Sequence, residues 1–399
     1  MKFMEEKKGM TPLSVLDQPK VEFEEDKVLY TNRIQKFSDL GYTEITKENF
    51  LEISPAPWSV DFQFTAVCNQ HCSFCSYEDR NKHLKKNSYG LVKRVHKDLI
   101  EMGTRGLIYT GGGEPLSWRD EGKTIKDIVL EQNYGIQTKP SLVTNGVMLN
   151  TLISPEIISK FHFISISVYG HNEEVFKDVV KVNTFKLQTK NFKNIMKLKK
   201  DYNLKYPEIQ AKILITRENY KYLAEIYNFY KNEIKPDHIS MRCVNNFEEG
   251  QDVELLPSQK EELKEIVKQK LDINEAYVED FLNSLLPPPN LIPATNCWTI
   301  KLGHNLLIST LGEVYIEIPY GATKEYCIGN LNEKSIKEIW GSEKHLEVIN
   351  MLNNRMTSLG CDLRMCRHHK YNKVMDDYLE NKTLTPASSD FDLKHGYYL

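Results

Sequence analysis

The sequence predicts an α/β protein in which six βα units surround a parallel sheet. Short β-rich runs alternate with amphipathic stretches, and polar or glycine-rich motifs follow several of the runs. The 399 residues are enough for one large core and a smaller one. Amphipathic stretches such as Tyr89–Met102 and Tyr220–Lys231 predict helices. We expect strands at Val60–Ala66, Gly106–Thr110, Ser141–Thr144, Phe163–Val168, Ile209–Thr216 and His238–Cys243.

Proline-rich breaks divide the chain into four expected parts. Residues 1–57 form an N-terminal extension, with a β-like stretch around Val28–Tyr30 and a break at its end formed by Pro55 and Pro57. Residues 58–286 form the core, whose last element is expected to be a long helix over Ser258–Leu286. Pro287-Pro288-Pro289 then marks a stiff boundary.

A small α+β domain is expected over residues 287–380, followed by a tail at 381–399. Asn305–Ser309 and Glu313–Ile318 flank Thr310-Leu311-Gly312, which predicts a β-hairpin. Helices are expected at Ser335–Trp340 and Glu343–Met351.

Charge and cysteine usage restrict the class of protein. A net charge of −3 and a pI near 6.4 provide no basic excess for nucleic acid or an anionic membrane surface. The first residues lack the apolar region of a signal peptide, and no apolar run reaches the ~18 residues of a membrane span. We therefore expect a cytoplasmic protein whose eight cysteines are metal ligands or buried thiols rather than disulfides.

Three cysteines directly follow the first expected strand, at positions 68, 72 and 75. Three thiolates can bind three irons of a cubane cluster and leave the fourth iron open to another ligand. Two other interpretations remain: one helical face carrying buried thiols, or a zinc site completed by His71.

The segment from Cys68 to Cys75 resembles the Cys-x3-Cys-x2-Cys signature of the radical S-adenosylmethionine (SAM) superfamily, including the aromatic Phe74 before the last cysteine. Gly111-Gly112-Gly113-Glu114-Pro115 resembles the family motif that holds the SAM amino group, which implies this role for Gly112, Gly113 and Glu114. Thr144-Asn145-Gly146 is similar to the family's third-strand motif.

Ser165–Gly170 resembles the fourth-strand segment that contacts the SAM ribose, so Phe74, Asn145 and Ser167 join the expected cofactor-binding residues. Tyr169 stands where the family often has an aspartate.

This resemblance covers about residues 58–245 and implies a partial (β/α)6 TIM-like barrel. It also implies that Cys68, Cys72 and Cys75 hold a SAM-binding [4Fe-4S] cluster. The implied chemistry is reductive cleavage of SAM to a 5′-deoxyadenosyl radical that abstracts hydrogen from a substrate. A reductant such as flavodoxin or ferredoxin is an expected partner.

Four late cysteines supply the thiols that a second [4Fe-4S] cluster requires: Cys297, Cys327, Cys361 and Cys366. Their layout resembles the twitch or SPASM auxiliary-cluster domain, as do Gly312-Glu313-Val314-Tyr315 and Ile328-Gly329-Asn330-Leu331 followed by Ile339-Trp340. The family's second ligand falls near Glu317, so either Cys327 or Glu317 completes the set. A structural zinc site, with Arg367-His368-His369 nearby, is the other interpretation.

Cys243 ends the sixth expected strand, where a thiol facing the barrel interior could return a hydrogen atom to a substrate radical. Its other interpretation is a buried small residue. Glu317, Arg242 and Arg217 are candidates for accepting a proton or binding substrate charge, or for structural salt bridges.

The expected function is oxidation or epimerisation of a small-molecule or natural-product substrate. The alternative is a maturase of ribosomally made peptides, although residues 1–57 are short for the leader-recognition domain that many such enzymes carry. A second alternative is a non-enzymatic protein stabilised by zinc. RNA modification is disfavoured because no basic domain is present.

Overall fold

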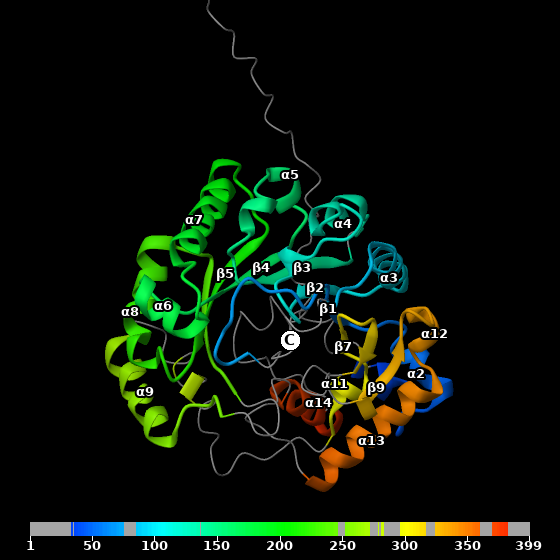
Figure 1. Ribbon diagram of the computed structural model, residues 1–399. Helices are drawn as coiled ribbons and strands as arrows, with labels where there is room; N and C mark the ends of the chain where they lie inside the picture. The colour runs from blue at the N-terminus through cyan, green and yellow to red at the C-terminus, as the bar shows by residue number, and fades with distance from the viewer. Residues whose placement is uncertain are drawn as a thin grey trace, which may run out of the picture.

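The computed structural model describes residues 33–34, 36–75, 85–135, 137–245, 252–271, 278, 281–282, 296–316, 324–359 and 369–381. Its centre is a nine-stranded sheet in the order β6-β5-β4-β3-β2-β1-β7-β8-β9. The strands curve into an open barrel with helices along the outer side (Figure 1).

Six parallel strands form the larger part of this sheet, as predicted. They are β1 (Ser59–Gln63), β2 (Gly106–Thr110), β3 (Lys139–Thr144), β4 (Phe163–Val168), β5 (Glu208–Ile215) and β6 (His238–Cys243). Three of the predicted ranges agree at both ends, and β1 ends three residues earlier than expected. The α/β class and the partial barrel are thereby confirmed.

The connecting segments form short helices on the outer side. They are α3 (Tyr89–Met102), η2 (Pro115–Ser117), α4 (Ile125–Glu131), η3 (Leu149–Leu152), α5 (Pro155–Ile158), α6 (Glu173–Val180), α7 (Phe185–Asp201), η4 (Tyr220–Tyr222), α8 (Leu223–Phe229), the π-helical turn η5 (Tyr230–Ile234) and α9 (Pro257–Lys270).

Local sequence explains where these helices begin and end. The Ser88 hydroxyl accepts the backbone N–H of Leu91 at the start of α3, and Gly103 ends α3 with φ +92°. The predicted helix over Tyr220–Lys231 is divided among η4, α8 and η5. The predicted helix over Ser258–Leu286 is interrupted, because α9 ends at Lys270 and the buried Leu271 is extended (φ −103°, ψ 124°). Of the residues beyond it, the structure describes 278, 281 and 282, which are helical.

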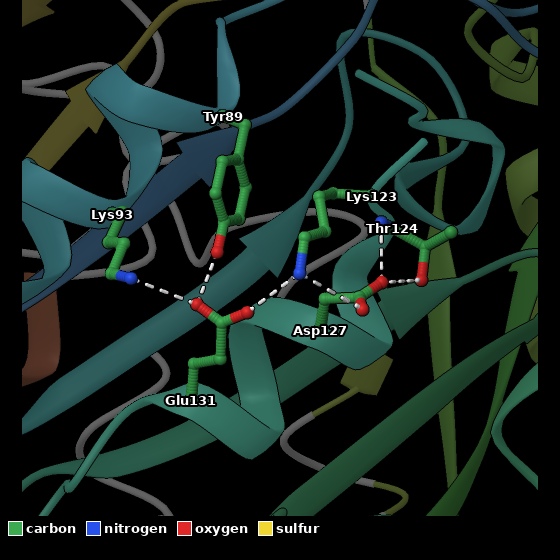
Figure 2. Close-up of polar contacts among 6 residues, drawn as sticks. All are labelled: Tyr89, Lys93, Lys123, Thr124, Asp127 and Glu131. Carbon is green, nitrogen blue, oxygen red and sulfur yellow. Dashed lines mark hydrogen bonds and ion pairs between the residues drawn. The ribbon is translucent and has the colours of Figure 1, made fainter. Parts of the chain in front are cut away.

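A polar cluster joins α3 to α4 on the outer surface (Figure 2). The Glu131 carboxylate binds Lys93 and Lys123 at 3.1 and 3.0 Å and accepts a hydrogen bond from Tyr89. Hydrogen bonds from Tyr89 and the two lysines lower the pKa of Glu131 to about 2. This cluster stabilises the contact between helices and lies away from the sheet interior.

The two faces of the sheet differ in polarity, as the two-residue period of a strand requires. Val60 and Phe62 of β1 pack with the helices in the main hydrophobic core. Successive side chains point to opposite faces, so Ser59, Asp61 and Gln63 lie on the inner face. This polar inner face surrounds the space in which the strand ends present their motifs.

A C-terminal hairpin extends the same sheet. β7 (Asn305–Ile308) pairs parallel with β1, while β8 (Glu313–Tyr315) and β9 (Cys327–Asn330) continue antiparallel. The predicted hairpin is confirmed, although no sequence pattern indicated its pairing with β1. The remaining helical segments are α11 (Trp298–Lys301), η7 (Lys324–Tyr326), α12 (Ile336–Ile339), α13 (Glu343–Leu359) and α14 (His369–Asn381).

The described part of the N-terminal extension packs against this C-terminal region. Phe50 of α2 (Lys47–Ile53) lies 5.4 Å from Trp340 between ring centroids, and Trp340 Nε1 donates to the Ser54 carbonyl at 2.9 Å. Arg33 donates to the carbonyls of Leu302 and Gly303 just after α11. Val28–Tyr30, the proline-rich break at 287–289 and the tail beyond Asn381 lie outside the described residues. None of the described helices is long and apolar enough to cross a membrane.

Candidate cofactor and substrate site

The loop after β1 carries Cys68, Cys72 and Cys75, each partly exposed. We call residues 68–75 the cysteine loop. Two of its backbone N–H groups donate to the last carbonyls of α6, His71 to Val180 and Ser73 to Val179, at 3.0 Å each. The loop is therefore fixed by the crossover helix that follows β4.

Apolar contacts with α6 and its neighbours also hold the cysteine loop. Cys72 and Phe74 pack against a small cluster that we call the α6 cluster, formed by Tyr169, Phe176, Val179 and Val180 with Phe185 and Leu214. Burial raises the pKa of Tyr169 well above its usual value, and the neighbouring Cys72 and Cys68 add to this shift. At the position where the family often has an aspartate, this chain therefore has a buried tyrosine packed against the cysteine loop.

The glycine motif after β2 packs directly onto the residues just before the cysteine loop. The Gly113 N–H donates to the Thr65 carbonyl and the Glu114 N–H to the Val67 carbonyl, at 2.8 Å each. A Cβ at Gly113 would lie 2.2 Å from the Val67 oxygen, so only glycine fits. Gly112 has φ +87°, which also favours glycine.

Glu114 joins the ends of β2 and β3. Its buried carboxylate accepts hydrogen bonds from Thr144 Oγ1 at 2.6 Å, the Asn145 N–H at 2.8 Å and the Leu116 N–H at 3.1 Å. Burial raises the pKa of Glu114 to about 7, and these hydrogen bonds limit the shift. A carboxylate accepts about four hydrogen bonds, so one position remains for a ligand such as the SAM amino group.

Asn145 connects β3 to the cysteine loop. Its side-chain N–H group donates to Asn69 Oδ1 at 2.6 Å and lies 3.9 Å from the Cys68 sulfur. Gln188 of α7 donates to the Asn145 carbonyl at 2.6 Å and to the Ser167 carbonyl at 2.9 Å. Sequence reasoning missed Gln188, whose only signal is a fully buried polar residue in the apolar face of a helix.

Cations lie on the inner face beside Ser167. In the sheet register, Ser167 pairs with Lys212 of β5, and Leu214 pairs with Arg242 of β6. Leu214 belongs to the α6 cluster, against which Cys72 also packs, so Arg242 lies one strand away from that cluster. Arg217 instead pairs with the exposed Asp252, with Nη1 and Oδ2 3.1 Å apart, which matches its structural interpretation.

Of the two interpretations of Cys243, the structure supports the buried residue and not the thiol that faces the barrel interior. Cys243 pairs in register with Ile215, and both pack with the main core on the helix side of the sheet. Burial raises the pKa of the Cys243 thiol to about 12. The neighbouring Arg242 takes the inward position because adjacent strand residues point to opposite faces.

The cysteine loop fits a cluster held by three thiolates, because its three cysteines lie on one short segment whose backbone is fixed at both sides. Among the described residues, no three His, Cys, Asp or Glu side chains converge on the position of a single metal ion.

Two of the late cysteines can be placed. Cys297 is buried at the start of α11, with Thr299 Oγ1 3.3 Å from its sulfur and the Asn372 side-chain N–H group donating to the sulfur at 3.6 Å. These polar hydrogens suit a thiolate ligand. Cys327 begins β9 opposite Tyr315. Cys361, Cys366 and Glu317 lie outside the described residues, so the choice between Cys327 and Glu317 stays open.

Comparison with known families gives two matches. The model of the radical SAM superfamily matches residues 62–230, and the model of the SPASM iron-sulfur cluster-binding domain matches residues 297–371.

Curated relatives are distant. The tungsten-containing aldehyde ferredoxin oxidoreductase cofactor-modifying protein of Pyrococcus furiosus is 23% identical over 71% of this chain and 80% of its own length. A probable GTP 3′,8-cyclase of Sulfurisphaera tokodaii is 28% identical over 41% of this chain, a match that spans about half (49%) of that protein.

Solved structures share the fold at low identity. Native anSMEcpe with bound AdoMet and Cp18Cys peptide has a TM-score of 0.53 at 16% identity, covering 86% of this chain and 96% of that one. Streptococcus suis SuiB bound to the precursor peptide SuiA has a TM-score of 0.55 at 13% identity, covering 89% of this chain and 90% of that one.

Proposed function

Because this chain belongs to the radical SAM superfamily and carries a C-terminal SPASM domain, we propose that it oxidises a small-molecule substrate held on the inner face of its sheet. Its cofactors are SAM, a SAM-binding [4Fe-4S] cluster and an auxiliary cluster. When bound, the first cluster and SAM supply a 5′-deoxyadenosyl radical that abstracts a hydrogen atom.

One observation carries this proposal: direct hydrogen bonds join the motifs at the ends of β1, β2 and β3. Glu114 accepts from the Asn145 backbone, and the Asn145 side chain donates to Asn69 within the cysteine loop. Motifs at the carboxyl ends of parallel strands meet at one end of a barrel, where such folds place their active sites.

We assign the cofactors to the following residues of the chain. Cys68, Cys72 and Cys75 would hold the SAM-binding cluster, and Phe74 of the same loop packs against the α6 cluster. Gly112, Gly113, Glu114, Asn145 and Ser167 would bind SAM, and the α6 cluster would keep water away from the loop. Cys297, Cys327, Cys361 and Cys366 would hold the auxiliary cluster.

Oxidation is favoured over epimerisation by the position of Cys243. An epimerase needs a hydrogen donor inside the barrel, and Cys243 packs on the outer side. In an oxidation the substrate loses a hydrogen atom, then one electron and one proton, and the auxiliary cluster is the expected electron acceptor. Glu317 is our candidate for accepting the proton.

A small polar substrate is favoured by the inner face, where Lys212 and Arg242 flank Ser167 and Leu214. The two curated relatives are named for action on a cofactor and on GTP. A peptide is the second candidate, since the titles of two similar structures name bound peptides.

Anaerobic reconstitution tests this function. Two [4Fe-4S] clusters give about eight irons per chain, and dithionite should then drive formation of 5′-deoxyadenosine from SAM. A triple Cys68→Ala, Cys72→Ala, Cys75→Ala variant should keep about four irons and make no 5′-deoxyadenosine. Zinc without iron, or intact SAM under every reducing condition, would refute the proposal and favour a structural metal protein.

A further inference from the structure

We propose that a stripe of lysines on α7 is the docking surface for a small acidic one-electron carrier protein. The lysine stripe consists of Lys186, Lys190, Lys193, Lys197 and Lys200. This inference rests on the proposed function, because it assigns the route by which the cluster on the cysteine loop is reduced.

The spacing of the lysine stripe places its side chains on one helical face. Successive members are four or three residues apart, which is the repeat of a single face of an α-helix. All five residues are exposed. The opposite face of α7 is buried through Gln188, Asn191, Phe192 and Ile195, and α7 lies on the outer side of the sheet beside α6 (Figure 1).

The charge of α7 is one-sided. The helix contains six lysines, and its single acidic residue is Asp201 at the last position. The other described helices of eight residues or more mix both signs: α3, α6, α9, α13 and α14. In a chain whose net charge is −3, the lysine stripe is therefore a local positive surface.

Nearby carboxylates neutralise only part of this charge. Lys186 pairs with Glu173 at 2.6 Å, Lys193 with Glu233 at 3.8 Å, and Lys197 with Asp201. Within the described ranges, Lys190 and Lys200 form no ion pair. Exposed ion pairs are weak and exchange readily with a partner's carboxylates.

The helix that carries the lysine stripe begins next to the cysteine loop. Thr184, the residue before α7, accepts a hydrogen bond from Gln70 of the loop at 3.4 Å. Phe185, the first residue of α7, belongs to the α6 cluster, against which Cys72 also packs. An α-helix with side chains is about 10–12 Å across, so a protein docked at the Lys186 end of the stripe would lie about one helix diameter from the loop.

The transfer itself involves one electron and no atom. The carrier is oxidised by one electron and the cluster is reduced by one. Opposite charges on two proteins accelerate their encounter and orient them, and this attraction weakens as salt screens it. An acidic carrier of the flavodoxin type has the charge that the lysine stripe complements.

Binding of recombinant flavodoxin to the reconstituted protein tests this inference. A stripe variant, Lys190→Glu with Lys193→Glu and Lys197→Glu, should raise the flavodoxin dissociation constant about tenfold or more at low salt. A matched variant on α9, Lys264→Glu with Lys268→Glu and Lys270→Glu, makes the same change in net charge and should leave binding near wild type. Added salt should weaken wild-type binding more steeply than binding of the stripe variant.

The inference is overturned if flavodoxin does not bind the wild-type protein at low salt. It is also overturned if the stripe variant binds like wild type, or if both variants lose affinity equally. Dithionite needs no docked protein, so 5′-deoxyadenosine formation with dithionite reports on the proposed function separately. Its absence from the wild-type protein would contradict the proposed function, whereas the dissociation constants decide the docking surface.

Discussion

The side-chain amide of Asn372 donates a hydrogen bond to the sulfur of Cys297, with 3.6 Å between nitrogen and sulfur. The same side chain accepts the Thr299 N–H at 3.0 Å, so α14 holds both the cysteine and the helix that follows it. Hydrogen bonds to cluster sulfurs raise reduction potentials because they stabilise the more negative reduced state.

We therefore expect Asn372→Leu to lower the midpoint potential of the auxiliary cluster by on the order of 60 mV, the one-electron equivalent of a hydrogen bond worth about 1.4 kcal/mol. Asn372→Asp keeps an acceptor for Thr299 but loses the donor and adds negative charge, so its potential should fall further. A redox titration followed by electron paramagnetic resonance (EPR) measures this. The SAM-binding cluster is the internal control, and an unchanged auxiliary potential in both variants would show that Asn372 does not act on the cluster.

Gly113 should tolerate no side chain. In Gly113→Ala the new Cβ would lie 2.2 Å from the Val67 oxygen, and the displaced backbone is that of the residues just before the cysteine loop. We expect a loss of about 2 kcal/mol or more in unfolding free energy and a lower iron content. Gly90→Ala in α3 is the matched control, since nothing lies within 4 Å of its Cβ and the substitution should stabilise by about 0.5–1 kcal/mol. Equal behaviour of the two variants would contradict the packing described here.

Glu114 should make the stability of the protein without SAM depend on pH. Burial raises the pKa of Glu114 to about 7 from an ordinary 4.5, so the folded state holds a proton that the unfolded state releases. Its contribution is fully present below pH 4.5 and is lost as pH rises through about 7, about 3 kcal/mol in all. Glu114→Gln should flatten this part of the pH profile. Thermal unfolding of both proteins between pH 4.5 and 8 measures this dependence. If stability changed equally with pH in wild type and Glu114→Gln, Glu114 would not be its source.

Cys243→Ala should preserve turnover. The thiol packs with the main core on the helix side of the sheet, so its loss should cost about 1–2 kcal/mol of stability without affecting the reacting groups. Iron content and 5′-deoxyadenosine formation should match wild type. A variant with both clusters intact but no substrate turnover would restore Cys243 as a hydrogen donor.

Much of the core could be predicted from sequence because its signals are local. The two-residue period of Phe163–Val168 and the glycines after Thr110 mark a strand and its end without reference to distant residues. The orientation of Cys243 could also have been inferred. Met241 and Cys243 share a face by alternation, and an apolar Met241 indicates the helix side.

The rest depends on contacts between distant segments. The pairing of β7 with β1 joins residues more than 200 positions apart, and no pattern within Asn305–Ile308 encodes its neighbour. Gln188 and Asn372 act through hydrogen bonds to other elements. The end of α9 follows from the burial of Leu271, where tertiary packing overrides helical propensity.

EPR spectra of the reduced protein with and without SAM show whether Cys68, Cys72 and Cys75 hold a cluster to which SAM binds. SAM should change the spectrum of the wild-type protein and of a Cys297→Ala/Cys327→Ala variant. SAM should have no effect on a Cys68→Ala variant that retains the auxiliary cluster. A wild-type spectrum that SAM leaves unchanged would show that SAM does not bind to a cluster on these cysteines.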